Sequence, residues 1–377
     1  MLDKFKKEIT YCTFCPKMCR FACPVAEALD SETLIPSGKL TLLYLLQDKA
    51  LEINKEMVEV FYKCTTCMAC RTYCKHEIEV PQVLEAARAL AVREGVTLER
   101  VDNLIQVMES SLNPYGEDLK DKLKKIVPER LLNKDTEILY FPGCTAINYY
   151  PEDITDTIRI LERLKVKFSV YSGESLSASQ RLQAGGEASM CCGFLAKTLG
   201  YLDTFEIFKE KNIKLLTKYK TIISGCPECI YALKREYRLR AEVLHITQFL
   251  EKFLTKPLFP NPQKLNYKII YHDPCYLGRY LGVYEEPREL LSRFCREKIT
   301  EFSWNKEGSA CCGWGGGESF IFPEIAKSIA KKRLEEFEES KATLLITACP
   351  SCRQMFERAN DKIKVKDIIN LIAESIS

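Results

Sequence analysis

Residues 309–317 read Ser-Ala-Cys-Cys-Gly-Trp-Gly-Gly-Gly, and the rest of the chain is organised around this stretch. Neighbouring side chains of a regular strand face opposite ways, so two adjacent cysteines cannot both enter one hydrophobic core. The glycines that follow allow the backbone to approach a bulky object closely. The pattern therefore indicates a bound object such as a metal cluster rather than ordinary core packing.

The same signature occurs earlier, at Cys191-Cys192-Gly193, with similar surroundings. In each copy one cysteine follows a predicted strand upstream, and a Cys-Pro-x-Cys follows a second strand downstream. In α/β domains, sites form beyond the carboxyl ends of strands, so three such loops can converge on one point. An internal repeat of about 120 to 130 residues is therefore predicted. Its cysteines are Cys144, Cys191, Cys192, Cys226 and Cys229 in copy one, and Cys275, Cys311, Cys312, Cys349 and Cys352 in copy two.

Two further cysteine runs precede the repeat. The second run has the spacing of a bacterial ferredoxin, and the first has one extra residue before Cys19. A short loop wraps three thiolates around one [4Fe–4S] cluster, and the fourth cysteine, expected on the following helix, reaches the other cluster. Structural zinc is the alternative, because Cys-x-x-Cys pairs also bind zinc. Lys75 stands where a proline is usual. The predicted cluster ligands are Cys12, Cys15, Cys19 and Cys74 for one site, and Cys64, Cys67, Cys70 and Cys23 for the other.

The composition supports cysteine as the metal ligand. The chain has 19 cysteines among 377 residues but only three histidines, which argues against histidine-rich zinc or mononuclear iron sites. Disulfides are disfavoured in a reducing cytosol, where clustered cysteines indicate metal. The two predicted runs and the two copies use all of the cysteines but Cys295, which we interpret as a buried spare.

Charge and hydropathy exclude other classes of protein. The net charge of +3 gives no nucleic-acid signal. The first ten residues lack the apolar region of a signal peptide, and the longest aliphatic run, Leu40–Leu46, is too short to span a bilayer. We expect a cytoplasmic protein without a transmembrane segment of its own, so that any attachment to the inner membrane face is made through a partner.

Hydrophobic periodicity predicts a multidomain α+β and α/β architecture. Residues 1–134 are predicted to form a mostly helical ferredoxin-type domain with two [4Fe–4S] clusters. Alternating strands and helices predict two α/β domains, at residues 135–260 and 261–377, joined by a proline-rich linker at 256–263. Asp203 is predicted to cap a helix, with Glu206 three residues later. The predicted helices are 39–49, 55–62, 82–94, 98–110, 154–164, 203–218, 287–294 and 324–340, and the predicted strands 138–141, 168–171, 221–223, 268–271 and 344–347.

The sequence resembles a known family. The order Cys, Cys-Cys-Gly, Cys-Pro-x-Cys is typical of the CCG (cysteine-rich) domain, and two such domains behind a two-cluster segment resemble the D-type subunit of heterodisulfide reductase. The same layout occurs in the iron–sulfur subunits of anaerobic glycerol-3-phosphate dehydrogenase and glycolate oxidase. The resemblance covers nearly the whole chain and is most specific at residues 271–275, Tyr-His-Asp-Pro-Cys, and at 309–317.

The resemblance implies cofactors and chemistry. In heterodisulfide reductases, five such cysteines hold a non-cubane [4Fe–4S] cluster, and paired clusters cleave the coenzyme M–coenzyme B disulfide in two one-electron steps. One or two further [4Fe–4S] clusters are therefore expected in the repeat. In copy one, 46 residues separate Cys144 from Cys191, against 35 between Cys275 and Cys311, and the excess lies in residues 172–186. The implied catalytic residues are Cys275, Cys311, Cys312, Cys349, Cys352 and His272.

Two functions remain open, and whether the chain is itself an enzyme is not decided. The first is thiol–disulfide reduction at the CCG clusters. The second is electron transfer alone, with a flavoprotein, a membrane cytochrome b-type subunit or other iron–sulfur subunits as partners. His272 and Asp273 are either proton donors or members of a hydrogen-bond network at the end of a strand. Trp314 either shields a cluster from water or packs in the core. The glycine run lacks the P-loop lysine, so no nucleotide site is expected.

Overall fold

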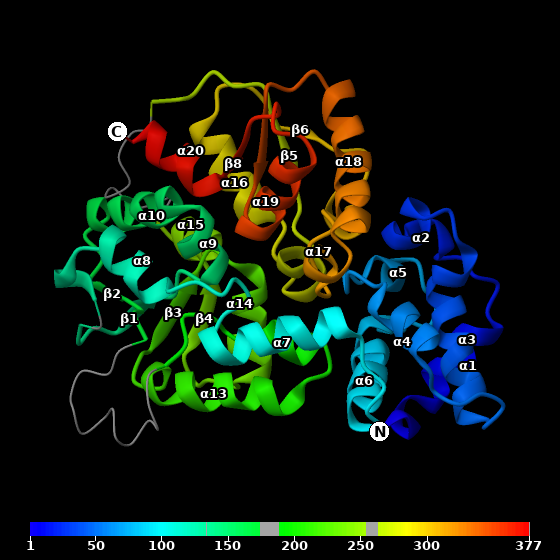
Figure 1. Cartoon of the computed structure of the whole chain (residues 1–377). Helices are drawn as coiled ribbons and strands as arrows, with labels where there is room; N and C mark the ends of the chain where they lie inside the picture. Colours follow the sequence, from blue (N-terminus) through cyan, green and yellow to red (C-terminus); the bar gives the residue numbers. More distant parts are fainter. Residues whose placement is uncertain (133, 174–187, 254–262, 377) are drawn as a thin grey trace.

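The N-terminal part of the chain is helical (Figure 1). The computed structural model describes residues 1–132, 134–173, 188–253 and 263–376. The four helices predicted between residues 39 and 110 are confirmed, and α6 begins with Val80-Pro81, because proline is tolerated where no N–H is needed. The helices are α1 (Lys6–Phe14), α2 (Pro24–Ala28), α3 (Pro36–Gln47), α4 (Lys55–Tyr62), α5 (Ala69–Thr72), α6 (Val80–Arg93), α7 (Glu99–Ser111) and α8 (Leu119–Ile126), with short turns η1 (Leu2–Phe5), η2 (Arg20–Ala22), η3 (Glu32–Leu34) and η4 (Glu129–Leu131).

A first parallel sheet follows, with strand order β2-β1-β3-β4. Its central strands are aliphatic and buried, as expected for a sheet covered on both faces. The register pairs Tyr140 with Val170 on one side and with Ile223 on the other. The elements are β1 (Ile138–Tyr140), α9 (Cys144–Tyr149), α10 (Pro151–Arg163), β2 (Phe168–Val170), α12 (Phe194–Thr198), α13 (Leu202–Leu216), β3 (Thr221–Ser224), α14 (Pro227–Tyr231), the π-helix η5 (Ala232–Glu236), β4 (Glu242–His245) and α15 (Ile246–Glu251).

A second parallel sheet has the corresponding order, β6-β5-β7-β8. In both sheets the strand before the first cysteine pairs directly with the strand before Cys-Pro-x-Cys, so the two loops leave the same edge. The elements are β5 (Ile269–His272), the π-helix η6 (Tyr276–Tyr280), α16 (Glu285–Phe294), β6 (Thr300–Glu301), η7 (Lys306–Gly308), α17 (Glu318–Ile321), α18 (Pro323–Glu339), β7 (Leu344–Thr347), α19 (Pro350–Ala359), β8 (Val365–Asp367) and α20 (Ile368–Ser375).

Two local predictions are wrong. Asp203 does not cap α13; the helix begins at Leu202, after Tyr201, and Asp203 lies in its first turn. The entry to this helix is set instead by Gly200, whose backbone packs so closely on α6 that a Cβ there would lie 2.5 Å from the Arg88 carbonyl carbon. The fourth cysteines of the N-terminal runs do not lie on a following helix either: Cys23 directly precedes α2, and Cys74 follows α5. The predicted linker at 256–263, except its last residue, and most of the polar stretch 172–186 lie outside the described residues.

One buried side chain, Arg88 on α6, joins the three parts of the chain. Its guanidinium donates five hydrogen bonds, all to backbone carbonyls. Each α/β part contributes one acceptor, and the N-terminal part contributes three. The acceptors are the oxygens of Phe61 (3.0 Å), Tyr62 (3.3 Å), Cys64 (3.0 Å), Thr198 (2.9 Å) and Gly316 (3.3 Å).

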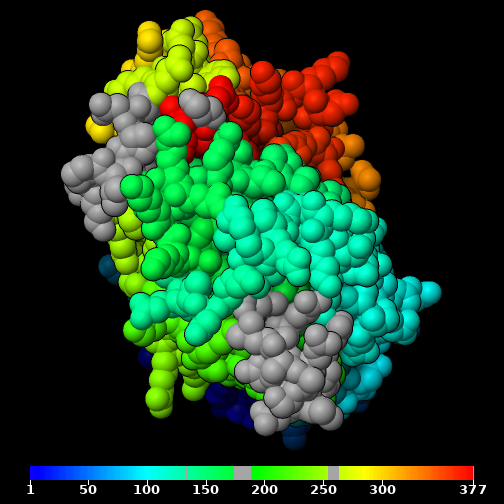
Figure 2. All heavy atoms as spheres, turned by 90° about the vertical axis from the view of Figure 1, so that its left-hand side faces the viewer, coloured from blue at the N-terminus to red at the C-terminus, as the bar shows by residue number. Residues whose placement is uncertain are grey.

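In Figure 2 the face turned to the viewer is formed mainly by the first α/β part and α7–α8, with the second α/β part above them.

Candidate metal centres

The first N-terminal set of cysteines is gathered around the end of α1. Cys12 lies within this helix, and Cys15 directly follows it. The pKa of the Cys12 thiol is raised, first by burial and then by the nearby charges of Cys15, Cys19 and Cys74. Burial, followed by the nearby charges of Cys74, Cys15 and Cys23, raises the pKa of Cys19 to about 11. The structure therefore brings these four thiols close together, as the spacing predicts.

The second N-terminal set encloses a small cavity. The loop from Cys64 to Cys70 bends through left-handed conformations at two non-glycine residues, Thr66 (φ 51°) and Met68 (φ 62°), which turns the chain tightly around its thiols. On the opposite side, the ammonium of the buried Lys39 lies 3.9 Å from the Cys23 sulfur. The cavity of about 20 Å³ is lined by Cys23, Cys64, Cys67 and Cys70 together with Lys39.

The five cysteines of copy one lie at the carboxyl edge of the first sheet. Three loops supply them: the loop after β1, the Cys-Cys-Gly segment before α12, and the start of α14 after β3. Their cavity has a volume of about 40 Å³. Side-chain hydrogen bonds connect the thiols in the order Cys144, Cys191, Cys192, Cys229 and Cys226.

Copy two repeats this arrangement at the second sheet. Its thiols are hydrogen-bonded in the corresponding order, Cys275, Cys311, Cys312, Cys352 and Cys349. One contact has no counterpart in copy one: the Cys311 side chain also lies against Cys67 of the second N-terminal set, in one buried cluster. The proximity of Cys311 lowers the pKa of Cys67 against the effect of burial, and the charge of Arg279 lowers it further. Thus copy two and the second N-terminal set meet directly.

His272 and Asp273 have different surroundings. The His272 ring is buried, and one of its nitrogens lies with the sulfurs of Cys312 and Cys352 in a group whose atoms are all within 4.8 Å of one another. Its Nδ1 has no hydrogen-bond partner among the described residues. Burial lowers the pKa of His272, and the hydrogen bond with Cys312 opposes that shift. Asp273 instead accepts two 2.8 Å hydrogen bonds from Arg288, so it belongs to a network at the end of β5.

The glycine run packs against protein backbone. A Cβ on Gly316 would lie 2.0 Å from the Cys64 oxygen, and one on Gly315 would lie 2.4 Å from the Thr65 oxygen. The predicted close approach is therefore present, but the object approached is the loop that carries the second N-terminal set. Trp314 and residues 315–317 also line the cavity of copy one. Trp314 thus contacts the other copy's site, where its side chain hydrogen-bonds Glu228.

Three charged residues near these sites were not predicted. Burial, with the charges of Cys192 and Cys312, raises the pKa of Glu228 to about 8, so this carboxyl lies between the two copies. Its place inside Cys-Pro-x-Cys is a signal that sequence analysis can use. Lys39 is 16 positions from Cys23, and Arg279, although it follows Cys275 closely, is 212 positions from Cys67, so no local pattern marks either residue.

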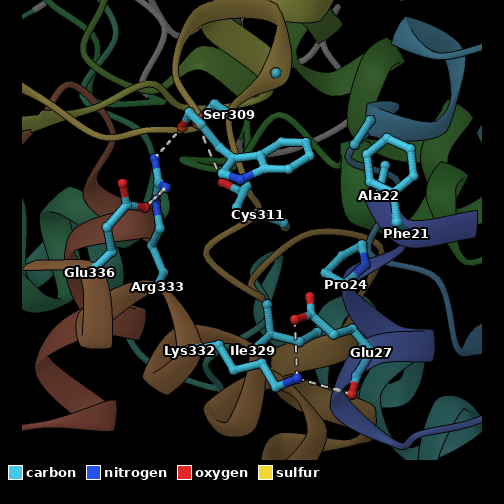
Figure 3. Close-up of a pocket in the computed structure, with 14 residues that line it drawn as sticks. Phe21, Ala22, Pro24, Glu27, Ser309, Cys311, Ile329, Lys332, Arg333 and Glu336 are labelled. Carbon is cyan, nitrogen blue, oxygen red and sulfur yellow. Dashed lines mark hydrogen bonds and ion pairs between the residues drawn. The ribbon is translucent and has the colours of Figure 1, made fainter. Parts of the chain in front are cut away.

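A larger cavity, of about 280 Å³, opens beside Cys311 between the N-terminal part and the second α/β part (Figure 3). In this view Phe21 and Pro24 line one side, and Arg333 lies on the other. An ion pair between Lys332 and Glu27, 3.2 Å between Nζ and Oε1, crosses the lower edge. Of the cysteines, only Cys311 is among its described lining residues.

These donor sets fit iron–sulfur clusters. Four converging thiols match the ligands of a [4Fe–4S] cluster, and five exceed what one tetrahedral zinc can use. Cys295, the remaining cysteine, is buried just beyond α16. Among the described residues, no helix is long and apolar enough to cross a membrane. The fold and its cysteine sets define an iron–sulfur protein in which a two-site helical part precedes two α/β parts.

Comparison with known proteins supports this assignment as an iron–sulfur protein. Residues 8–78 match the 4Fe-4S dicluster domain, and residues 181–234 and 269–357 match the cysteine-rich (CCG) domain. The chain is 31% identical to the D-type subunit of the dihydromethanophenazine:CoB–CoM heterodisulfide reductase of Methanosarcina barkeri, over 86% of this chain and 81% of that protein. It is 28% identical to the corresponding protein of Methanosarcina mazei, over 98% and 94% of the two chains. It is also 27% identical to the EtfAB:quinone oxidoreductase of Syntrophomonas wolfei, over 83% of this chain and 46% of that protein.

The chain therefore belongs to the CCG-domain family of iron–sulfur oxidoreductases that includes the D-type subunit of heterodisulfide reductase. It is an iron–sulfur electron-transfer subunit related to that protein and to the iron–sulfur subunits of other oxidoreductases.

Proposed function

We propose that this chain moves single electrons through two cubane [4Fe–4S] clusters in its N-terminal part to clusters held by the five-cysteine sets, and that copy two reduces a disulfide. The contact between Cys67 and Cys311 supports this most directly, because it joins the second N-terminal set to copy two. We keep the division at 1–134, 135–260 and 261–377 as part of the proposal. The non-cubane type of the clusters in the repeat, implied by the resemblance, is part of it as well.

The cavities favour copy two as the reacting site. About 280 Å³ beside Cys311 is close to the lower limit of small-molecule sites, whereas the cavity of copy one is about 40 Å³ and is lined by Trp314 and the glycine run. Reduction of a disulfide takes two electrons and two protons and releases two thiols. Bound clusters supply the electrons one at a time, and the protein's part is to enclose the reacting sulfurs with buried side chains. A proton-donor role for His272 stays a prediction.

Turnover with a dye tests the proposal. The protein is purified anaerobically with its clusters, reduced with a viologen dye, and mixed with a panel of disulfides that includes coenzyme M–coenzyme B. Dye reoxidation with many turnovers is expected with at least one disulfide. The variant Cys311→Ala should abolish it, and Cys295→Ala, at the buried cysteine outside all four sets, should not. Reducible clusters without turnover across the panel would contradict disulfide reduction.

Electron transfer alone is the second candidate. A relative named EtfAB:quinone oxidoreductase favours it, because its name places a flavoprotein and a quinone at the two ends of the path. The first N-terminal set also lies beside four exposed apolar side chains, a feature of partner-binding surfaces. A flavoprotein or another iron–sulfur protein would dock there, and a membrane cytochrome b-type partner would hold the chain at the inner face. The exposed residues are Tyr11 (43%), Phe14 (69%), Met18 (68%) and Phe21 (51%).

A further inference from the structure

Arg279 lies between the second N-terminal set and copy two. It belongs to η6, the π-helix that directly follows Cys275. Its Nε donates a 2.6 Å hydrogen bond to the Cys67 oxygen. Its Nη1 donates to the oxygens of Ser309, at 2.7 Å, and Glu307, at 3.0 Å, in the segment that leads to Cys311. One guanidinium therefore ties together two loops that carry cysteines of different sets.

Hydrogen bonds of residues near Arg279 also connect the two loops. The Tyr280 hydroxyl donates a 2.6 Å hydrogen bond to the Thr66 oxygen, and the Tyr276 hydroxyl lies 3.1 Å from the Thr66 hydroxyl. From the same N-terminal segment, the hydroxyl of Thr72 at the end of α5 donates to the Glu307 oxygen at 3.1 Å. These bonds hold the loop of the second N-terminal set against η6 and η7. The contact between the Cys67 and Cys311 thiols is thus fixed by side chains outside the predicted ligand sets.

The charge of Arg279 acts on both sets. Although burial alone would lower it, the pKa of Arg279 is raised by the nearby charges of Cys67, Cys275 and Cys311. Its Nη2 is buried and has no hydrogen-bond partner among the described residues. Hydrogen bonds to cluster sulfurs and net local charge both set the reduction potential of iron–sulfur sites. A fixed cation with a free N–H stabilises the more negative, reduced form on either side of it.

We propose that Arg279 is a positioning residue that couples the second N-terminal site to copy two, by holding Cys67 against Cys311 and by raising the reduction potential of both sites. This rests on the proposed presence of clusters in both sets, but not on disulfide turnover. Among the described residues, the hydrogen bonds of Arg279 reach no cysteine of the first N-terminal set, so the potential of that site serves as an internal reference.

The test compares variants of the full chain, loaded with clusters, in redox titrations followed by electron paramagnetic resonance without any disulfide. Arg279→Met should lower the reduced-to-oxidised ratio of the two adjacent sites at least about tenfold at a fixed potential, which is about 59 mV for a one-electron couple. Arg279→Lys keeps the charge, but its single ammonium lacks the planar fork whose Nε and Nη1 reach the two loops, so it should restore most of the potential and weaken the magnetic coupling between the sites. The matched control is Arg293→Met, at an exposed arginine of α16.

A further variant separates geometry from charge. Tyr280→Phe removes the bond to the Thr66 oxygen and leaves Arg279 in place. It should reduce the magnetic coupling between the sites. The reduced-to-oxidised ratio of each site at the same fixed potential should stay within threefold of that of the unaltered chain. Unchanged potentials in Arg279→Met with full iron content would overturn the inference. If that variant loses its clusters, Arg279→Lys and Tyr280→Phe decide, and unchanged coupling in both would also overturn it. Shifted potentials in a chain that turns over no disulfide would retain the inference and reject disulfide reduction.

Discussion

Replacing Arg88 with methionine should destabilise the whole chain. The Arg88→Met variant keeps a side chain of similar length but removes the five hydrogen bonds that join the three parts. A buried polar group left without its partner costs about 1–3 kcal/mol. Removal of the buried charge returns some of this, since its desolvation no longer opposes folding. We therefore expect the free energy of unfolding to fall by about 3–5 kcal/mol.

Thermal unfolding under anaerobic conditions measures this loss. An unfolding entropy of about 2.1 cal/mol/K per residue gives about 0.8 kcal/mol/K for 377 residues, so 4 kcal/mol lowers Tm by about 5 °C if the chain unfolds as one unit. The Tm of Arg88→Lys, whose ammonium has three donors, should lie between that of the unaltered chain and that of Arg88→Met. The control is Arg93→Met on the same helix, whose ion pair with Glu94 is exposed and worth at most about 1 kcal/mol. A Tm for Arg88→Met within 1 °C of that control would refute the reasoning.

The remaining predictions concern close packing, docking and pH. Gly316 has a φ of 68°, and Gly316→Ala places a Cβ 2.0 Å from the Cys64 oxygen. The free energy of unfolding should therefore fall by at least about 2 kcal/mol in thermal unfolding. An unchanged Tm would contradict the packing argument. Phe14→Asp, on the exposed apolar surface near the first set, should slow stopped-flow reduction by a protein donor but not by a viologen dye; equal slowing by both would argue against docking there. Burial raises the pKa of Asp367 to about 7, so the folded chain keeps a proton that the unfolded chain releases near pH 4, and the free energy of unfolding should fall as pH rises between these values. Asp367→Asn should make that fall smaller in denaturant titrations at pH 5 and 8, and an unchanged difference in the free energy of unfolding between the two pH values would count against it. The control for Gly316→Ala is Gly225→Ala, where nothing lies within 4 Å of the added Cβ. The controls for Phe14→Asp and Asp367→Asn are Leu202→Asp and Asp361→Asn, both at exposed positions.

Local patterns predicted most of the long elements. The strands β1, β3, β5 and β7 are short aliphatic runs followed by turn residues, and the long helices show a 3.6-residue periodicity. The edge strands β4, β6 and β8 escaped prediction. Thr300 and Glu301 of β6 are both exposed, and β4 has only two consecutive apolar residues, Val243 and Leu244, so neither segment is long enough to show a strand pattern of its own. They become strands because a neighbouring strand offers hydrogen bonds, which is a property of the sheet and not of the segment.

Spacing in the sequence identifies the loops that carry the cysteines, because ligand spacing within one loop is a local property that neighbouring residues fix. The structure places the thiols of each set together, and their ligation of clusters stays a prediction. How the sets face one another follows from the packing of the separate parts of the chain, which no local pattern describes. Arg279 reaches the Cys67 oxygen across 212 positions, and Arg88 reaches the Gly316 oxygen across 228. No periodicity or motif extends that far, because such contacts arise when separately formed parts pack and bury their polar groups against each other.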